Sequence, residues 1–181
     1  MSRPPRAREV VLDAFEQILS HEGARAATMD AVARTAGVSK GGLLYHFASK
    51  EALETAMVER LLRLVDEDLE ELASASEGSV SYFLRTSAAE DDALDRAMIA
   101  VARLAQAGSA PARDAIGEVR RLWEDALRPH VRDETSLDLV MLLADGLSFN
   151  NALGGEAPLT VVPRGEALTE LVALVARTTA R

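Results

Sequence analysis

Side chains that could bind a polyanion are concentrated in one short stretch, residues 28–53. Ser39 and Lys40 supply a hydroxyl and an ammonium group, and the glycines that follow, Gly41 and Gly42, leave the backbone free of bulk. Each glycine costs roughly 1 kcal/mol in a helix interior relative to alanine, so helix stability does not explain the pair. Either the glycines lie in a frayed first turn, or they let backbone N–H groups approach a phosphate closely. We favour close approach to DNA.

Two short helices joined by a tight turn would hold these side chains in place. Ser39 is a good N-cap for the second helix, and Gly37 tolerates the positive φ that a steep crossing requires. Helix-turn-helix proteins present such a second helix to the major groove of DNA. Small and apolar residues at helical spacing predict the first helix: Met29, Val32, Ala33 and Ala36.

Residues 28–53 resemble the DNA-binding segment of TetR/AcrR-type transcriptional regulators. The turn at 33–39, ARTAGVS, matches the A-x-x-A-G-V-S pattern of that family. The exit also matches, with YHF at 45–47 followed by SKEAL at 49–53. Leu44 departs from the pattern, because many members have there the first aromatic residue of a Tyr-Tyr pair. The resemblance covers about the first 55 residues and implies a DNA-binding head on a helical body.

The residues that we expect to contact DNA either can donate to phosphates and base edges or occupy the family motif. Thr28 could instead do no more than cap its helix, and the ring of Tyr45 could pack on the domain core. Arg6 and Arg8 belong to a short proline-containing arm, which could reach DNA or remain a solvated tail. The predicted DNA-binding set is Thr28, Ser39, Lys40, Gly41, Gly42, Leu44, Tyr45, His46 and Lys50.

The charge distribution reconciles an acidic chain with a nucleic-acid partner. The 181 residues carry a net charge of −9, but residues 1–50 hold seven Lys and Arg against five Asp and Glu. The remainder holds 13 basic and 24 acidic residues. Both lysines of the chain, Lys40 and Lys50, flank the proposed recognition helix. A mildly basic head on an acidic body suits a protein that docks DNA at one end.

Helical periodicity runs through the whole chain, and no segment shows convincing strand alternation. We therefore expect an all-α fold, with a three-helix DNA-binding domain at 1–48 and a helical effector-binding and dimerisation domain at 49–181. No apolar run approaches the ~20 residues needed to span a bilayer, and no signal-peptide core is seen, so we expect a soluble, cytoplasmic protein without a membrane partner.

Enzymatic chemistry finds no support in the sequence. Cysteine is absent, and three scattered histidines lack metal-ligand spacing. The segment at 146–150, GLSFN, fails the G-x-S-x-G pattern at its last position. We expect no catalytic residue, no metal and no cofactor.

The C-terminal part carries scarce aromatic and amide residues among apolar ones. Trp123 could line an effector pocket or be an ordinary core residue, and Asn150 could bind a ligand or cap its helix. The proposed effector-pocket residues are Phe83, Met98, Trp123, Phe149 and Asn150. The family resemblance implies that the last two helices pair with those of a second subunit, through residues such as Leu139, Leu143, Leu147, Leu168, Leu171 and Val175.

Two hypotheses follow. The first is a homodimeric transcriptional regulator, a repressor released from its double-stranded DNA operator by a small-molecule effector of unknown identity. An effector can shift this equilibrium only by its differential affinity for the two states. The second is an all-helical protein-interaction module with a degenerate DNA-binding head.

Overall fold

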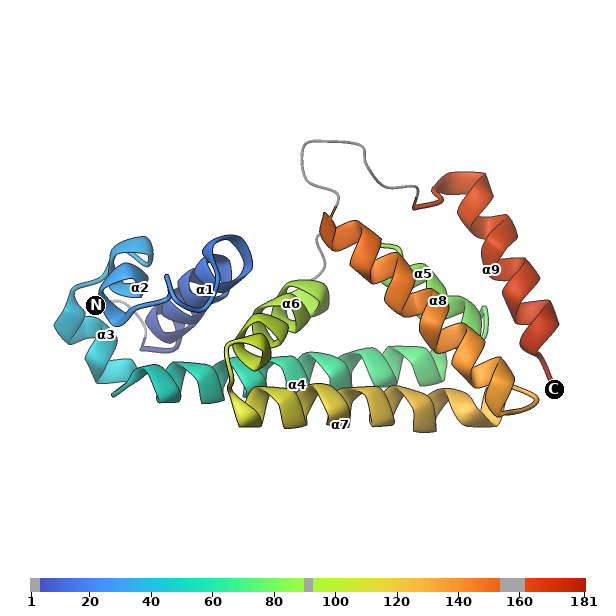
Figure 1. The fold of residues 1–181 in the computed structure, drawn as a ribbon, viewed down its shortest axis with the longest axis horizontal. Coiled ribbons are helices and arrows are strands. Elements are labelled where there is room, and N and C mark those ends of the chain that lie inside the picture. The colour runs from blue at the N-terminus through green and yellow to red at the C-terminus, as the bar shows by residue number, and fades with distance from the viewer. Residues whose placement is uncertain (1–3, 90–92, 154–161) are drawn as a thin grey trace. The chain divides into compact units, whose positions relative to one another are not determined.

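A computed structural model describes residues 4–89, 93–153 and 162–181, and every regular element within them is helical (Figure 1). The predicted all-α class is therefore confirmed for the described part of the chain. The elements are α1 (Pro4–Glu22), α2 (Met29–Thr35), α3 (Lys40–His46), α4 (Lys50–Ser74), α5 (Ser79–Ser87), α6 (Ala93–Gln106), α7 (Ala110–Leu127), the 3₁₀ turn η1 (Arg128–His130), α8 (Glu134–Leu153) and α9 (Gly165–Thr179).

The chain folds as two compact units. Unit 1 comprises Met1–Leu64 and Ala93–Glu118, and unit 2 comprises Val65–Asp92 and Val119–Arg181. The helices α4 and α7 each contribute residues to both units. The boundary that we placed between residues 48 and 49 falls inside unit 1, because the first half of α4 and the whole of α6 join the N-terminal helices.

Unit 1 is built on the apolar face of α1, which packs against α2, α3 and α6. Phe15 and Leu19 on α1 are fully buried, as are Leu43 on α3 and Leu53 on α4. The turn between α2 and α3 is closed by Gly37, whose φ of 66° is a conformation that side chains with a Cβ rarely adopt. This turn fixes the direction in which α3 leaves the core.

The proline-containing segment at the N-terminus is helical from Pro4 onwards and not an arm, contrary to our prediction. Helix α1 begins at Pro4, so Arg6 and Arg8 both lie within it. Proline is compatible with the first turn of a helix, where its missing N–H would have no helical partner. The guanidinium of Arg8 lies 5.1 Å from the ring centroid of Phe47, which ties the start of α1 to the end of α3.

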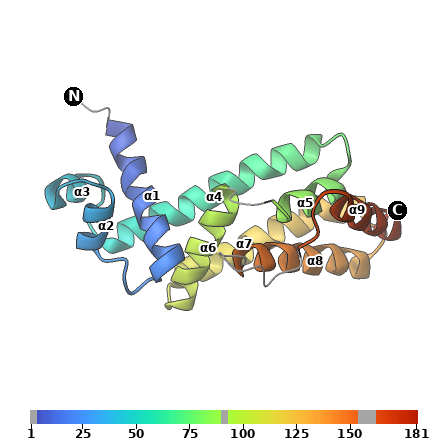
Figure 2. The same ribbon diagram turned by 90° about the horizontal axis from the view of Figure 1, so that it is seen from above.

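Unit 2 has its own core between α5, α8 and α9, which contact one another in all three pairings (Figure 2). Phe83, Leu84, Val140 and Met141 are buried there. Arg164, just before α9, donates to the carbonyl of Ala88 at the end of α5. Within the described residues, no helix is both long enough and apolar enough to cross a membrane.

Candidate nucleic-acid interface

Helix α3 is anchored on one side and open on the other. The Ser39 hydroxyl accepts a hydrogen bond from the Gly42 amide at 3.0 Å and so caps the helix, as the sequence predicted. Leu43 and Phe47 are 0% and 2% exposed and attach α3 to the core of unit 1. The exposed positions of this helix, Lys40, Gly41, Leu44 and Tyr45, are therefore open to a partner.

The open side of α3 carries an apolar and an aromatic residue. Tyr45 is 82% exposed and Leu44 is 43% exposed. The ring of Tyr45 stands edge-on to His46, with 5.1 Å between centroids. The alternative that Tyr45 packs on the domain core is excluded by this exposure.

The two glycines at the start of α3 differ in their surroundings. A Cβ on Gly42 would lie 3.3 Å from the Ser39 Oγ, so the N-cap itself favours a small residue there. A Cβ on Gly41 would meet nothing within 4 Å. The packing of the chain on itself therefore does not require glycine at position 41.

The two lysines have different roles. Lys40, the first residue of α3, lies with its Nζ 2.9 Å from the Asp30 Oδ1 on α2. The Lys50 Nζ donates to the Ala24 carbonyl at 2.8 Å and is partly buried, so this side chain holds the loop between α1 and α2 against α4. Neither partner was predicted, because both contacts depend on how separate elements of unit 1 meet.

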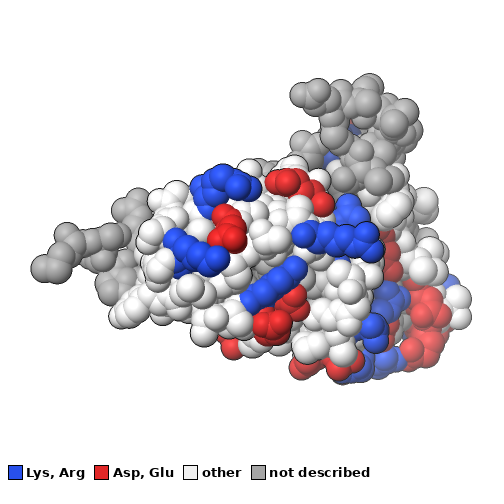
Figure 3. All heavy atoms as spheres, turned by 60° about the vertical axis from the view of Figure 1, so that its left-hand side comes forward, with Lys and Arg blue, Asp and Glu red and all other residues white. Residues whose placement is uncertain are grey.

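Thr28 adopts the capping role that the sequence left open. Its Oγ1 accepts from the Ala31 amide at 3.2 Å at the start of α2, and the residue is exposed. The face that contains α2 and α3 shows Lys and Arg side chains interspersed with Asp and Glu over a largely uncharged surface (Figure 3). On the described atoms of this face, the basic side chains are scattered among acidic ones and do not gather in one broad patch.

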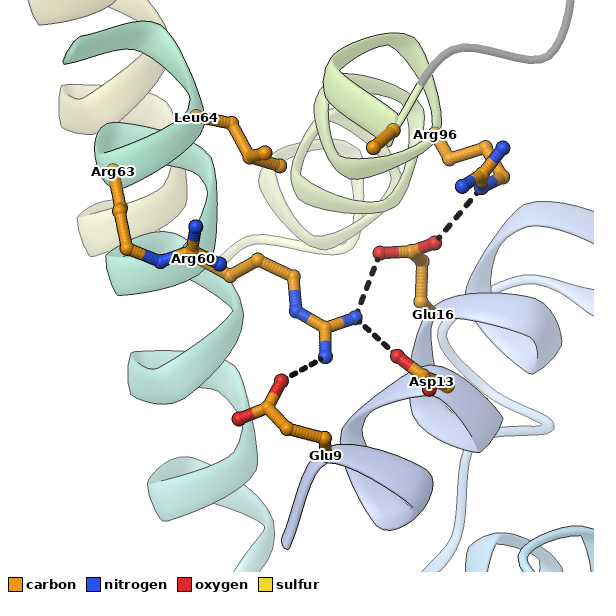
Figure 4. Close-up of a pocket in the computed structure, with 8 residues that line it drawn as sticks. Glu9, Asp13, Glu16, Arg60, Arg63, Leu64 and Arg96 are labelled. Atoms are coloured by element: carbon orange, nitrogen blue, oxygen red, sulfur yellow. Dashed lines mark hydrogen bonds and ion pairs between the residues drawn. The ribbon is translucent and has the colours of Figure 1, made fainter. Parts of the chain in front are cut away.

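A network of ion pairs, which sequence reasoning missed, joins three helices of unit 1 (Figure 4). The Arg60 guanidinium on α4 pairs with three carboxylates of α1: Glu9 at 2.7 Å, Asp13 at 2.8 Å and Glu16 at 3.2 Å. The other oxygen of Glu16 lies 3.4 Å from the Arg96 Nε on α6. Burial alone would lower the pKa of Arg60, but the carboxylates outweigh it and raise that pKa.

The network borders a cavity of 190 Å³ that Arg63, Leu64 and Ala93 also line. None of the residues that we assigned to an effector pocket lies in its wall. The i, i+4, i+7 spacing of the three carboxylates on α1 was the available signal for this cluster, because it places them on one helix face.

The predicted effector-pocket residues are divided between the units. Met98 lies on α6 in unit 1, whereas the others belong to unit 2. There Phe83 and Trp123 stack at an angle with ring centroids 5.5 Å apart, and the indole N–H donates to Asp68 Oδ2 at 2.9 Å. Phe149 is 63% exposed, and the side-chain amide of Asn150 donates to the backbone carbonyl of Gly146 in the same helix.

The predicted dimer residues also divide into two groups. Leu147 and Val175 are only 5% and 6% exposed and belong to the core of unit 2, so they offer little surface to a partner. Leu143, Leu168 and Leu171 are partly buried against that core. Leu139 is 45% exposed, and three more large hydrophobic side chains on α8 and α9 are exposed: Leu142, Leu174, and Phe149, which we had assigned to the effector pocket.

Helices α2 and α3 are joined by a tight turn at Gly37 and packed on α1, and α3 has an exposed face. This arrangement is that of a helix-turn-helix protein. Residues 11–57 match the family described as bacterial regulatory proteins, tetR family. On this match, residues 11–57 form a helix-turn-helix segment of the tetR family type.

Known relatives agree with this assignment. The HTH-type transcriptional regulator UidR of Escherichia coli K12 is 39% identical over 57 residues, which cover 32% of this chain and 28% of UidR. The HTH-type transcriptional regulator BetI of Rhizobium meliloti is 38% identical over 64 residues, covering 35% of this chain and 32% of BetI. Each match therefore spans about a third or less of the relative.

The fold is shared over a much larger part of the chain. The solved structure of the ketosteroid transcriptional regulator KstR2 of Mycobacterium tuberculosis superposes with a TM-score of 0.65 at 18% identity, covering 96% of this chain and 95% of KstR2. At this identity the likeness concerns the fold alone.

Proposed function

We propose that the chain is a sequence-specific DNA-binding transcriptional regulator that reads its operator with α3. The observation that carries the proposal is the contrast along this helix. Leu43 and Phe47 are buried, whereas Tyr45 and Leu44 beside them are exposed although they are aromatic and apolar. Such side chains can contact thymine methyl groups and phosphates in the major groove.

The test is equilibrium binding to duplexes from the DNA upstream of the gene, compared with random DNA of the same length. Binding should be saturable and should weaken with salt. The logarithm of the binding constant should fall against the logarithm of the salt concentration, with a slope of about −0.9 for each neutralised phosphate. The double substitution Lys40→Ala, Tyr45→Ala should abolish the preference, and Arg113→Ala, an exposed residue on α7, is the control. If the double variant binds as well as the wild type, the alternative of an all-helical interaction module gains support.

We infer that the regulator acts as a homodimer through α8 and α9. Within the described residues, seven large hydrophobic side chains are exposed, and four of them lie on these two helices: Leu139, Leu142, Phe149 and Leu174. A second copy of the chain would cover this surface, and two-fold pairing would present two recognition helices to a palindromic operator.

Light scattering on the purified chain tests this inference. The wild type should have twice the mass of the chain, and Leu142→Glu should yield monomers because a carboxylate would be buried in an apolar interface. Val10→Glu, at an exposed apolar position on α1, is the matched control and should leave the dimer intact. A monomeric wild type at micromolar concentration would contradict the inference.

We further propose that the regulator represses transcription and that a small molecule relieves this repression. This proposal is supported by the family resemblance, and we place the effector site in unit 2 near Phe83 and Trp123. A compound library screened by thermal shift should yield molecules that raise the melting temperature of the chain, since ligands that bind the folded state stabilise it. A true effector must also weaken operator binding, and Trp123→Phe should reduce its affinity.

A further inference from the structure

The ammonium group of Lys40 is paired within the chain. Its Nζ lies 2.9 Å from the Oδ1 of Asp30, and the two side chains are 61% and 71% exposed. The pair bridges the first turn of α2 and the first residue of α3 across the helix-turn-helix. It therefore lies on the elements with which the proposed regulator would approach DNA.

The charges near this pair are few. Between residues 28 and 48 the chain has one acidic residue, Asp30, and two permanent cations, Arg34 and Lys40. The next cation, Lys50, is engaged with the Ala24 carbonyl. Asp30 thus cancels half of the positive charge of the helix-turn-helix segment.

Stability gives little reason for the pair itself. An exposed ion pair contributes little to folding, because solvent screens it and both side chains lose conformational freedom. Lys40 also stands at the positive end of α3, where the helix dipole disfavours a cation, and no acidic residue lies in the first turn of that helix. A lysine at this position is better explained by a polyanionic partner.

We propose that Asp30 acts as an electrostatic brake on DNA binding by holding the ammonium of Lys40. A phosphate must compete with the Asp30 carboxylate for this ammonium, and the carboxylate is itself repelled by the phosphates. Both effects lower the net release of counterions from DNA, which drives non-specific binding. This inference rests on the proposed function and identifies a residue that sets the strength of its electrostatic component.

The experiment compares the wild type with Asp30→Asn on a random duplex of roughly 30 base pairs, long enough for two recognition helices one turn apart. Fluorescence anisotropy is recorded over a series of salt concentrations. Asp30→Asn should bind roughly two- to five-fold more tightly per recognition helix at low salt, the range expected for an exposed ion pair. Its logarithmic salt slope should be steeper by up to ~0.9 per Lys40.

Matched variants separate a local brake from a general change of charge. Asp114→Asn makes the same charge change at an exposed position on α7 and should bind like the wild type. Asp30→Glu keeps the carboxylate and should also behave like the wild type. If Asp30→Asn does not fold, as judged by circular dichroism, Asp30→Ser provides the same loss of charge.

Two results would overturn the proposal. One is equal binding by the Asp30→Asn and Asp114→Asn variants, and the other is weaker binding by a folded Asp30→Asn, which would make Asp30 a residue that positions Lys40. A wild type that binds no DNA at low salt would instead remove the proposed function, so the two failures are distinguishable.

Discussion

Replacing Arg60 by methionine should lower the free energy of unfolding by about 3 kcal/mol. The side chain is only 10% exposed, and its guanidinium serves three carboxylates of α1 at once. Methionine fills a similar length without a charge, so the substitution removes the cation and leaves Glu16, itself 12% exposed, with Arg96 as its remaining ion-pair partner in the network.

The magnitude follows from the exposure of each pair. Losing one partner of a buried ion pair costs about 3–5 kcal/mol, and the Arg60–Glu16 pair falls at the low end because Arg96 still neutralises part of the Glu16 charge. Glu9 and Asp13 are 51% and 65% exposed, so their pairs with Arg60 are largely screened by solvent and add little to this cost. A loss of about 3 kcal/mol corresponds to a melting temperature lower by roughly 6–12 °C for a chain of this size.

Urea denaturation followed by far-ultraviolet circular dichroism measures the change. Glu9→Gln is the comparison, because it removes only the ion pairs of a half-exposed carboxylate, with Arg60 at 2.7 Å and with Arg8 at 3.6 Å, and should cost no more than about 1 kcal/mol. If Arg60→Met costs no more than Glu9→Gln, the network behaves as a set of surface pairs and the reasoning from burial is refuted.

Three further predictions concern glycine and tyrosine positions. Gly41→Ala should keep or raise the melting temperature, because alanine favours the helix and a Cβ there meets nothing within 4 Å, but it should weaken operator binding; unchanged binding would remove close backbone approach as the reason for this glycine. Gly37→Ala, at a φ of 66°, should cost about 1–2 kcal/mol of stability in the same denaturation assay. Burial and the nearby carboxylates of Glu71 and Asp68 raise the pKa of Tyr82, so its stabilising contribution is complete below the usual tyrosine pKa of about 10 and is lost as pH rises through the higher folded value. Melting temperatures measured above pH 10 should therefore fall less steeply for Tyr82→Phe than for the wild type.

Local signals in the sequence predicted the helix-turn-helix well. The turn at Gly37, the cap at Ser39 and the exposed Tyr45 depend on backbone preferences and on spacing within a few residues. The prediction of an irregular arm before the first helix was wrong, because the two prolines are compatible with the first turn of α1.

Features that depend on contacts between distant helices could not be predicted in this way. Leu147 and Val175 have the same helical spacing as the exposed leucines, and only the packing of α5 against α8 and α9 separates the buried face from the open one. The partners of Lys50 and Arg60 lie 26 and 44 or more residues away, beyond the reach of any periodic pattern.

Trp123 is the single tryptophan of the chain, so its fluorescence reports on unit 2. Its indole N–H donates to Asp68, and its ring packs against Phe83. Its emission will follow the melting of unit 2, whereas the loss of helix signal sums over the entire chain. Unfolding curves from the two probes will coincide if the units melt as one cooperative block. If the curves separate, the two units do not unfold together and differ in stability.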